Sequence, residues 1–431
     1  MHAFQYLDGV LHCENVNLSA VAEQHGTPLY VYSAGTILDH YRRLNEALRE
    51  LDHTICYAVK ANSNLAILRL LREAGAGFDI VSGGELFRVL KAGGDPKQCT
   101  FAGVGKSAEE IEFALAQGVA CFNVESEAEL EEINRIAADK SVRAPIALRV
   151  NPDVAAGSHE YVSTGQSENK FGIALERAAQ VYEHSARLPH LAIRGVQMHI
   201  GSQITEAAPF AEAIRKVVPL VRQLQQRHAL EFFSIGGGMG IIYQRALESG
   251  RGQWWHEQGA ESSAFSVEAY ARAVVPPLQS LGLRILLEPG RFLVGNAGVL
   301  LTRVRYVKQA EAKKFLIVDA GMNDLIRPAL YQSYHEIVPV RAAASETRER
   351  VDVVGPVCES GDFFAQGRGL PEMRAGDLAA IMSAGAYGFV MASNYNSRRL
   401  PAEVLVEDEK FILVRERQTY DDLVRGERDA I

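Results

Sequence analysis

Over the first two thirds of the chain, short apolar runs alternate with longer stretches in which apolar residues recur at helical spacing. Short runs bounded by turn residues indicate buried strands, and the longer stretches indicate amphipathic helices. The predicted strands are 53–60, 77–81, 99–103, 120–124, 145–151, 193–199, 231–235 and 284–288. The predicted helices include 36–50, 64–74, 84–92, 107–116, 127–138, 210–227 and 267–281. This order predicts an α/β fold, a parallel TIM-like (β/α)8 barrel over residues 35–290.

The rhythm changes after residue 294, where strand patterns follow one another without long helices between them. These strands are predicted at 299–308, 314–319, 336–340, 351–357, 378–383 and 402–406, and the run 4–11 is a further strand-like segment. We therefore expect a mostly antiparallel β-domain, sandwich-like or barrel-like, made of residues 1–34 and 291–431. Residues 248–263 interrupt the barrel pattern as an insertion to which the sequence assigns no function.

Composition narrows the class of protein. The 431 residues carry a formal charge of −8, which argues against non-specific binding to nucleic acid. No apolar run approaches the ~20 residues of a membrane-spanning helix, and the amino terminus shows no secretory pattern. The five cysteines are far apart, without the spacing of a disulfide framework or a zinc site. These features predict a cytoplasmic enzyme with no metal and no membrane partner.

Lys60 is the first candidate for chemistry. Alternation along 53–60 places Cys56, Ala58 and Lys60 on one face, which is small except for its terminal amine. Active sites of barrels lie at the carboxyl ends of the strands, where a desolvated lysine can form a Schiff base with an aldehyde cofactor. A solvated lysine at a strand end is the ordinary alternative.

Two loops suggest a phosphorylated ligand. SIGGGMG at 234–240 follows the seventh strand, and EPGR at 288–291 follows the eighth. Barrels often bind phosphate with these two loops, and consecutive glycines let backbone N–H groups approach an anion. Glu288 ends a buried strand, where a carboxylate needs a cation, either a pyridine N–H or a salt bridge to Arg149 or Arg291. His199, at another strand end, is either a ring that stacks on a cofactor or a structural residue.

Together these strings resemble the pyridoxal-phosphate-dependent decarboxylases with an alanine-racemase-like barrel, and most closely the diaminopimelate decarboxylases of lysine biosynthesis. The resemblance extends over nearly the whole chain in the expected order. The matching strings are YAVKAN at 57–62, GFDIVSGGEL at 77–86, LRVNPD at 148–153, STGQSENKFGI at 163–173, HIGSQ at 199–203, SIGGGMG at 234–240, EPGR at 288–291, NDLIRPALY at 323–331, GPVCESGD at 355–362 and SAGAYG at 383–388.

The resemblance implies a role for each of these sites. Lys60 holds pyridoxal 5'-phosphate as a Schiff base, His199 covers the ring, Glu288 stabilises the pyridinium, and Cys358 is the proton donor. The implied cofactor-binding residues are Lys60, Asp79, His199, Ser202, Gly236, Gly237, Gly238, Gly240, Glu288, Gly290, Arg291 and Tyr387. The implied substrate contacts are Arg291, Arg327, Tyr331, Glu359 and Tyr387. The resemblance also implies a homodimer whose two active sites are shared, with Cys358, Glu359 and Tyr387 reaching a partner chain.

The implied reaction is decarboxylation of meso-2,6-diaminopimelate to L-lysine and CO₂. Arginines suit the distal carboxylate of this substrate and Glu359 suits its ammonium. Ornithine-type relatives carry Cys-Asp-x-x-Asp, whereas this chain has CESGD at 358–362. This difference favours diaminopimelate, a two-headed substrate in the sense that it has an amino-acid group at each end. The alternatives are a decarboxylase of another basic amino acid or polyamine precursor, and a carrier that binds the cofactor without turnover. Retention of both Lys60 and Cys358 disfavours the carrier.

Overall fold

The computed structural model describes residues 2–154, 170–250, 266–343, 345 and 347–428. Most of the predicted insertion 248–263, and residues 163–169 of the string STGQSENKFGI, lie outside the described residues. Contacts divide the chain into two units. One contains the described residues of 39–241 and 266–292, and the other contains residues 2–38, 242–250 and those from 293 onward.

The first unit is a closed parallel barrel, as predicted. Each strand pairs with its neighbours in the order β5-β6-β7-β8-β9-β11-β12-β13, and β13 pairs with β5 to complete the ring. The short β10 (Ile173–Ala174) pairs only with β9 in this sheet. The barrel strands are β5 (His53–Ala58), β6 (Gly77–Ile80), β7 (Cys99–Phe101), β8 (Cys121–Val124), β9 (Ala144–Asn151), β11 (Leu191–Met198), β12 (Phe232–Ser234) and β13 (Arg284–Leu287).

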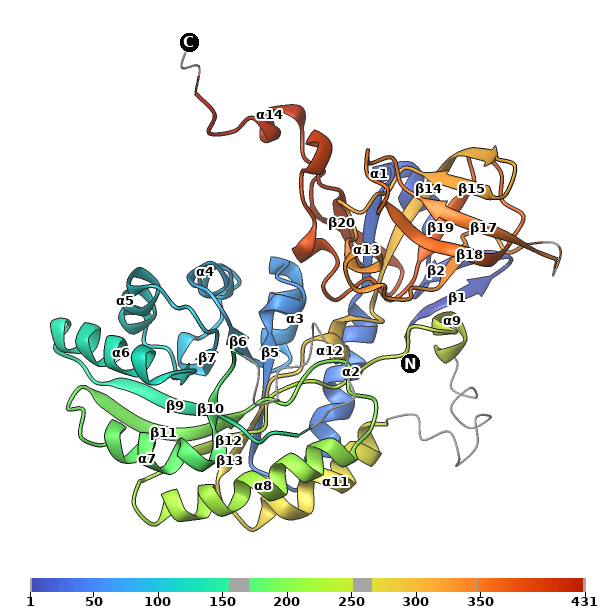
Figure 1. Ribbon diagram of the computed structural model, residues 1–431. Coiled ribbons are helices and arrows are strands. Elements are labelled where there is room, and N and C mark those ends of the chain that lie inside the picture. Colours follow the sequence, from blue (N-terminus) through green and yellow to red (C-terminus); the bar gives the residue numbers. More distant parts are fainter. Residues whose placement is uncertain (1, 155–169, 251–265, 344, 346, 429–431) are drawn as a thin grey trace. The chain divides into compact units, whose positions relative to one another are not determined.

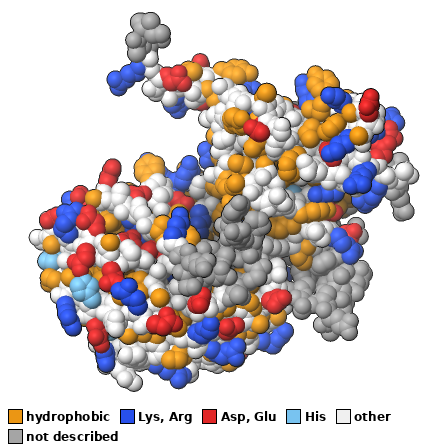
Figure 2. Space-filling view, viewed as in Figure 1, with side chains coloured by type: hydrophobic (Ala, Val, Ile, Leu, Met, Phe, Trp, Pro, Cys, Tyr) orange, Lys and Arg blue, Asp and Glu red, His pale blue; other side chains and the backbone are white. Residues whose placement is uncertain are grey.

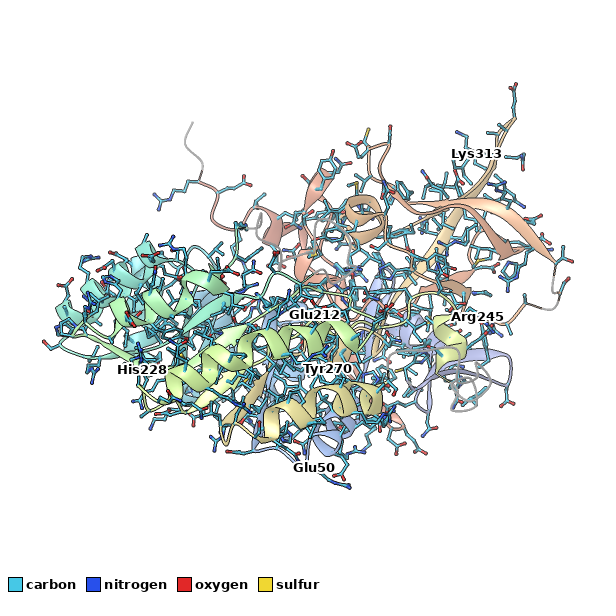
Figure 3. All side chains as sticks on the ribbon, turned by 60° about the horizontal axis from the view of Figure 1, so that its bottom comes forward. Glu50, Glu212, His228, Arg245, Tyr270 and Lys313 are labelled. Carbon is cyan, nitrogen blue, oxygen red and sulfur yellow. The ribbon has the colours of Figure 1, made fainter. Side chains whose placement is uncertain are left out.

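Helices surround these strands (Figure 1). They are α2 (Ala34–Ala47, which begins in the other unit), α3 (Leu65–Glu73), α4 (Gly83–Lys91), α5 (Ala108–Gln117), α6 (Glu127–Asp139), α7 (Leu175–Ser185), α8 (Ala208–Gln225) and α11 (Val267–Gln279). Helix α7 was not among the predicted helices. Helices α8 and α11 lie side by side, and Tyr270 of α11 meets Phe210 of α8 edge-to-face with ring centroids 5.0 Å apart (Figure 3). Basic and acidic side chains are interspersed over the surface of this unit (Figure 2). On α6, for example, Arg135 pairs with Glu132 and Asp139.

The barrel interior is packed. Cys56, Cys121, Ala147, Phe232 and Leu286 form one buried cluster although they come from five strands around the ring. Side chains from strands on different sides of a closed barrel meet only inside it, so these five point inward. Because side chains alternate along a strand, Ala58 shares the inward face with Cys56, as the sequence indicated.

The prediction that the first barrel strand continues through residue 60 is wrong. Strand β5 ends at Ala58, and Lys60 lies in a 3-10 turn, Val59–Ala61. The ladder to β13 stops at Ile55 and the ladder to β6 stops at Ala58. Val59 and Lys60 therefore have no neighbouring strand, and the chain turns at the barrel's carboxyl end. Glu288 and His199 likewise lie one residue beyond their strands, rather than within them.

The second unit is a mainly antiparallel sheet in the order β18-β17-β15-β14-β4-β20-β21, with β19 pairing β14 and β16. The ladders β15–β17 and β4–β20 are parallel, and the others between its described strands are antiparallel. Its strands are β4 (Leu29–Ser33), β14 (Gly298–Gln309), β15 (Lys314–Val318), β16 (Ile337–Pro339), β17 (Arg348–Val354), β18 (Phe363–Pro371), β19 (Leu378–Ile381), β20 (Ala402–Glu407) and β21 (Lys410–Arg415). Its helices include α1 (Leu18–His25), α9 (Ala246–Ser249), α13 (Arg327–Tyr331) and α14 (Tyr420–Leu423), and α12 (Arg291–Val294) links the two units in sequence.

The amino-terminal segment contributes to the core of this unit, including Phe4, Leu11 and Val31. The predicted single run 4–11 is instead a hairpin, β1 (Phe4–Leu7) and β2 (Val10–Cys13), followed by β3 (Val16–Asn17). Asp8 and Gly9 both have positive φ, 49° and 74°, as a tight Asp-Gly hairpin turn requires. The domain limits expected from sequence differ from the contact division in three places, since residues 35–38 and 242–250 belong with the second unit and residues 291–292 with the first. No helix within the described part of the chain is long and apolar enough to cross a lipid bilayer.

Candidate active site

Lys60 is placed at the carboxyl end of the barrel, opposite a buried acid. Its Nζ lies 2.8 Å from Oδ2 of Asp79, which ends up fully buried on β6. The Lys60 side chain retains 38% of its exposure, so the amine is accessible from one side. The other oxygen of Asp79, Oδ1, is buried without a hydrogen-bond partner among the described residues. An accessible amine beside a buried anion is a suitable arrangement for a lysine that binds an aldehyde.

Glu288 lies inside the barrel mouth and is 6% exposed. Its Oε1 accepts a hydrogen bond from Ser234 Oγ at 2.7 Å, and its Oε2 accepts one from Gln197 Nε2 at 3.0 Å. A longer contact of 3.5 Å joins Oε1 to Nδ2 of Asn123. These partners hold the carboxylate in one orientation, and they are neutral.

The salt-bridge alternative for Glu288 is wrong for the described residues. Arg149 pairs with Glu125 at 2.9 Å, and Arg291 donates from Nη2 to Ser202 Oγ at 3.0 Å, while no ion pair in the described chain joins either arginine to Glu288. Burial, reinforced by the Asp79 carboxylate, raises the pKa of Glu288 to about 7. A carboxylate in this state gains most from a cationic N–H partner, because such a partner restores the ionised form.

The glycine run after β12 is shaped by close backbone packing. A Cβ on Gly237 would lie 2.1 Å from the carbonyl oxygen of Glu288, and one on Gly236 would lie 2.4 Å from that of Met198. Gly238 has φ +110°, a conformation that L-residues rarely adopt. The N–H of Gly240 is already bonded to Ile204 O at 2.9 Å. Gly240 therefore holds the loop in shape rather than offering its N–H to a ligand.

Gly290 is also closely packed, in this case against the turn that carries Lys60. A Cβ at this position would lie 2.9 Å from Cβ of Ala61 and 3.2 Å from Cβ of Ala58. The loop after β13 can therefore run directly against the turn that carries Lys60 only because residue 290 is glycine.

His199 is tied to the glycine loop. Its Nδ1 accepts a hydrogen bond from the Gly237 N–H at 3.2 Å, so any proton on the neutral ring is carried by Nε2. Burial, with the nearby charges of Arg149 and Lys60, holds the pKa of His199 well below its usual value. A neutral, fixed imidazole beside the Lys60 amine can lie against an aromatic ring without adding charge.

These residues fit the pyridoxal phosphate implied by the resemblance. Lys60 offers the amine, Glu288 offers a buried acceptor for a ring N–H, and the glycine loop leaves no space for side chains. Buried acceptors without hydrogen-bond partners in the described chain lie on the residues around Glu288, namely Oδ1 of Asn123 and Oε1 of Gln197. No group of three or more potential metal ligands occurs in the part of the chain that the structure describes.

The remaining implied residues belong to the second unit. Arg327 is 5% exposed at the start of α13, and its Nε donates to His335 Nε2 at 3.3 Å. The guanidinium lies 5.3 Å from the ring centroid of Tyr243 and 5.7 Å from that of Tyr331. The rings of Tyr243 and Tyr331 thus hold Arg327 in one orientation. Tyr387, in the same unit, has a positive φ of 55° and lies between Gly385 and Gly388.

Cys358 and Glu359 lie on the loop between β17 and β18. Both are exposed, and Cys358 is the exposed thiol while the other four cysteines are buried. The Cys358 N–H donates to Asn396 Oδ1 at 2.7 Å. The structure thus gathers Lys60, Asp79, His199, Ser202, Glu288, Arg291 and the glycines at the barrel mouth, and describes the other five residues within the second unit.

Sequence reasoning missed the partners of Glu288. Ser234, Gln197 and Asn123 are buried polar residues on apolar strands, and this contrast is the signal that could have identified them. It also missed the buried Arg149–Glu125 pair, in which the second guanidinium nitrogen of Arg149 has no hydrogen-bond partner among described residues. Each of these residues lies within the last three residues of its strand or just beyond it.

Comparisons with known proteins show the family to which the chain belongs. Residues 34–295 match the family described as pyridoxal-dependent decarboxylase, pyridoxal binding domain. A diaminopimelate decarboxylase of Pseudomonas aeruginosa is 49% identical over 428 residues, which cover 99% of each chain. The structure of diaminopimelate decarboxylase from Helicobacter pylori complexed with L-lysine is 40% identical, with a TM-score of 0.88 over 96% of this chain and 100% of that one.

The enzyme of the same name from M. jannaschii, in co-complex with L-lysine, is 35% identical, with a TM-score of 0.89 over 99% of each chain. Similarity of this extent covers both units, not the barrel alone. The chain therefore belongs to the pyridoxal-dependent decarboxylases and, within that family, to the diaminopimelate decarboxylases.

Proposed function

We propose that this enzyme removes CO₂ from meso-2,6-diaminopimelate and releases L-lysine, with pyridoxal 5'-phosphate as its cofactor. The observation that carries the proposal is the buried carboxylate of Glu288, held by neutral partners in the same barrel mouth as the accessible Lys60 amine. This is the arrangement that a reaction through a carbanion needs. The relatives named above catalyse the reaction that their name states, and the similarity extends over the full chain.

When bound, pyridoxal phosphate supplies a protonated ring that accepts the electron pair left as the bond between Cα and the carboxylate breaks. Lys60 would hold the aldehyde carbon through its amine. Glu288 would accept the ring N–H and keep its proton in place, and His199 would shield one face from water. The site glycines other than Gly240, together with Ser202, would hold the phosphate end, and Ser202 also accepts a hydrogen bond from Arg291.

Cys358 is proposed as the proton donor. A thiol can act as a general acid toward a carbanion, and it would give its proton to Cα where the carboxylate has left. One carboxylate thus departs as CO₂, and one proton replaces it on carbon.

We propose that the enzyme selects its substrate by binding the second amino-acid group, at the end of diaminopimelate away from the reacting carbon. Arg291 and Arg327 provide guanidinium groups for carboxylates, and Glu359 provides an anion for the distal ammonium. Tyr331 and Tyr387 complete the contacts. A decarboxylase of ornithine or lysine would need only an anion at the distal end, so the buried Arg327 supports the two-headed substrate.

The proposal is tested by CO₂ release from the stereoisomers of diaminopimelate, and from lysine and ornithine, with and without added cofactor. We expect turnover of the meso isomer alone, dependent on the cofactor. Release from ornithine or lysine but not from diaminopimelate would establish the alternative, a decarboxylase of another basic amino acid. Borohydride reduction followed by peptide mass spectrometry should locate the trapped cofactor on Lys60, and an adduct elsewhere would refute the site.

We further propose a homodimer whose active sites combine residues of both subunits. Exposure of Cys358 and Glu359 on their loop supports this, because a partner chain can reach them. Mixing inactive Lys60→Ala and Cys358→Ala chains should restore one intact site per mixed dimer. No recovery after verified subunit exchange would refute the shared site. A free donor thiol is maintained in a reducing compartment, which supports the cytoplasm as the proposed location.

A further inference from the structure

Three loops of the second unit are joined around Cys358 by hydrogen bonds between residues far apart in the sequence. One loop follows β15 (319–324), the second connects β17 to β18 (355–362), and the third consists of the 3-10 turn Tyr395–Ser397 and Arg398, which ends it. The second loop carries the proposed proton donor. The first leads directly into α13, where the proposed substrate residue Arg327 lies.

Asp362 joins the first two loops. Its Oδ1 accepts the N–H of Met322 and its Oδ2 accepts the N–H of Val357, both at 2.6 Å, and the side chain is 4% exposed. Each carboxylate oxygen accepts one backbone donor, whereas an amide in the same place would turn its NH2 group, itself a donor, toward one of them. A Cβ on Gly355 would lie 2.4 Å from Oδ2, so the loop closes tightly around this carboxylate.

Asn396 joins the third loop to the second. Its side-chain Oδ1 accepts the backbone N–H of Cys358 at 2.7 Å, although the two residues are separated by 38 positions. Asn396 has φ 54° and ψ 29°, the left-handed conformation that is uncommon for non-glycine residues and most readily adopted by asparagine. An uncommon backbone conformation that aims a side chain at the neighbour of a reacting group suggests a functional reason for it.

Arg398 joins the third loop to the first. Its Nε donates to Asn323 Oδ1 at 3.1 Å and its Nη2 donates to the carbonyl of Asp319 at 2.6 Å. With Asp362 and Asn396, these bonds connect each loop to the other two. The Cys358 backbone is therefore held at its own N–H and, one residue earlier, at the N–H of Val357.

From this arrangement we propose that Asn396 is a positioning residue that holds the Cys358 backbone so that the thiol delivers its proton to Cα. The inference rests on the proposed function, because it assumes that Cys358 is the donor. A general acid acts efficiently only within hydrogen-bond reach of its acceptor, and displacement by about 1 Å can slow a step by up to about 100-fold. An exposed loop without such a bond would leave the thiol in several positions.

The test compares two substitutions in the full-length holoenzyme. Asn396→Gly removes the acceptor but tolerates the positive φ, so the turn keeps its conformation. Asn396→Asp keeps an acceptor oxygen and also tolerates this conformation. For Asn396→Gly we expect a fall in kcat of about tenfold with KM within about twofold, and for Asn396→Asp a kcat within about threefold of the parent.

Hydrogen exchange gives a second measurement that needs no substrate. Mass spectrometry of overlapping peptides that contain Cys358 should show faster exchange in Asn396→Gly, and exchange at the parent rate in Asn396→Asp. Unchanged exchange in Asn396→Gly would show that the bond does not form. Faster exchange with an unaltered kcat, or an Asn396→Asp enzyme as slow as Asn396→Gly, would reduce the contact to a structural one and overturn the inference.

Cys358→Ala separates this inference from the function on which it rests. A fall in kcat for Cys358→Ala without a fall for Asn396→Gly would overturn the positioning role and leave the donor role intact. Full activity of Cys358→Ala would instead refute the donor role itself, and with it the catalytic meaning of the contact.

Discussion

The amine of Lys60 lies 2.8 Å from Oδ2 of Asp79, a carboxylate that is fully buried beneath it. Lys60 is thus the cation that compensates a buried anion, in addition to its proposed role in binding the cofactor. A buried charge that loses its partner is strongly destabilising, whereas removal of both partners often is not.

We expect Lys60→Met to lower the free energy of unfolding of the cofactor-free chain by about 2 kcal/mol, less than for a fully buried pair because the lysine is partly exposed. The double variant Lys60→Met with Asp79→Asn should recover much of this loss, since no uncompensated charge remains. Urea unfolding of the cofactor-free chain followed by circular dichroism measures both. Equal stability of Lys60→Met and the parent would mean that the buried charge of Asp79 does not need Lys60 to compensate it.

Glu288→Gln should reduce kcat by roughly 100-fold, because the amide no longer stabilises a protonated ring nitrogen as charge develops. Its size and burial change little, so the fold should remain. Steady-state kinetics at saturating cofactor measures the effect, with Glu109→Gln, an exposed position on α5, as the control. A kcat within about threefold of the parent would argue against the proposed role of Glu288.

Stability of the cofactor-free chain should depend on pH through Glu288. Burial raises its pKa to about 7 from an ordinary value of 4.5, so the folded state binds more protons than the unfolded state between these values. The contribution to stability is therefore full below about pH 4.5 and is lost as pH rises through about 7. We expect the thermal unfolding temperature of the parent to fall relative to that of Glu288→Gln as pH rises from about 5 to about 8. A difference that does not change with pH would contradict the raised pKa.

Gly237→Ala should destabilise the barrel by about 1–3 kcal/mol and weaken cofactor binding, because the added Cβ would lie 2.1 Å from the carbonyl oxygen of Glu288. Gly105→Ala is the matched control, since nothing lies within 4 Å of its added Cβ. Thermal unfolding and titration with pyridoxal phosphate distinguish the two. Equal behaviour of the two variants would show that the glycine loop is not closely packed.

Arg327→Lys should raise the KM for diaminopimelate by roughly tenfold while changing kcat less, because lysine keeps the charge but loses the planar fork that binds a carboxylate with two hydrogen bonds. Arg374→Lys, at an exposed position of the same unit, is the control. Initial-rate kinetics over a range of substrate concentrations gives both constants. An unchanged KM would place the recognition of the distal carboxylate on other residues.

The repeated alternation of short apolar runs and amphipathic helices was enough to predict the barrel, because each strand is buried on both faces and each helix on one. The strand ends were less predictable. The ladders that join β5 to β13 and to β6 end at Ile55 and Ala58, before the turn that carries Lys60. Strand β4 was not predicted because its partners β14 and β20 are distant in sequence. Such pairings depend on contacts that local patterns do not encode.

The sequence alone determined the fold class, the family resemblance and the identities of Lys60, His199 and Glu288 as candidates, since these depend on local pattern and on motif order. Only the tertiary structure decided that Glu288 is held by Ser234 and Gln197 rather than by an arginine, and that Asn396 bonds to the backbone of Cys358. The reason is physical: the pKa of a buried acid and the position of an exposed thiol depend on groups brought together by folding. These groups are far apart along the chain, so their positions in the sequence do not show that they are neighbours in the fold.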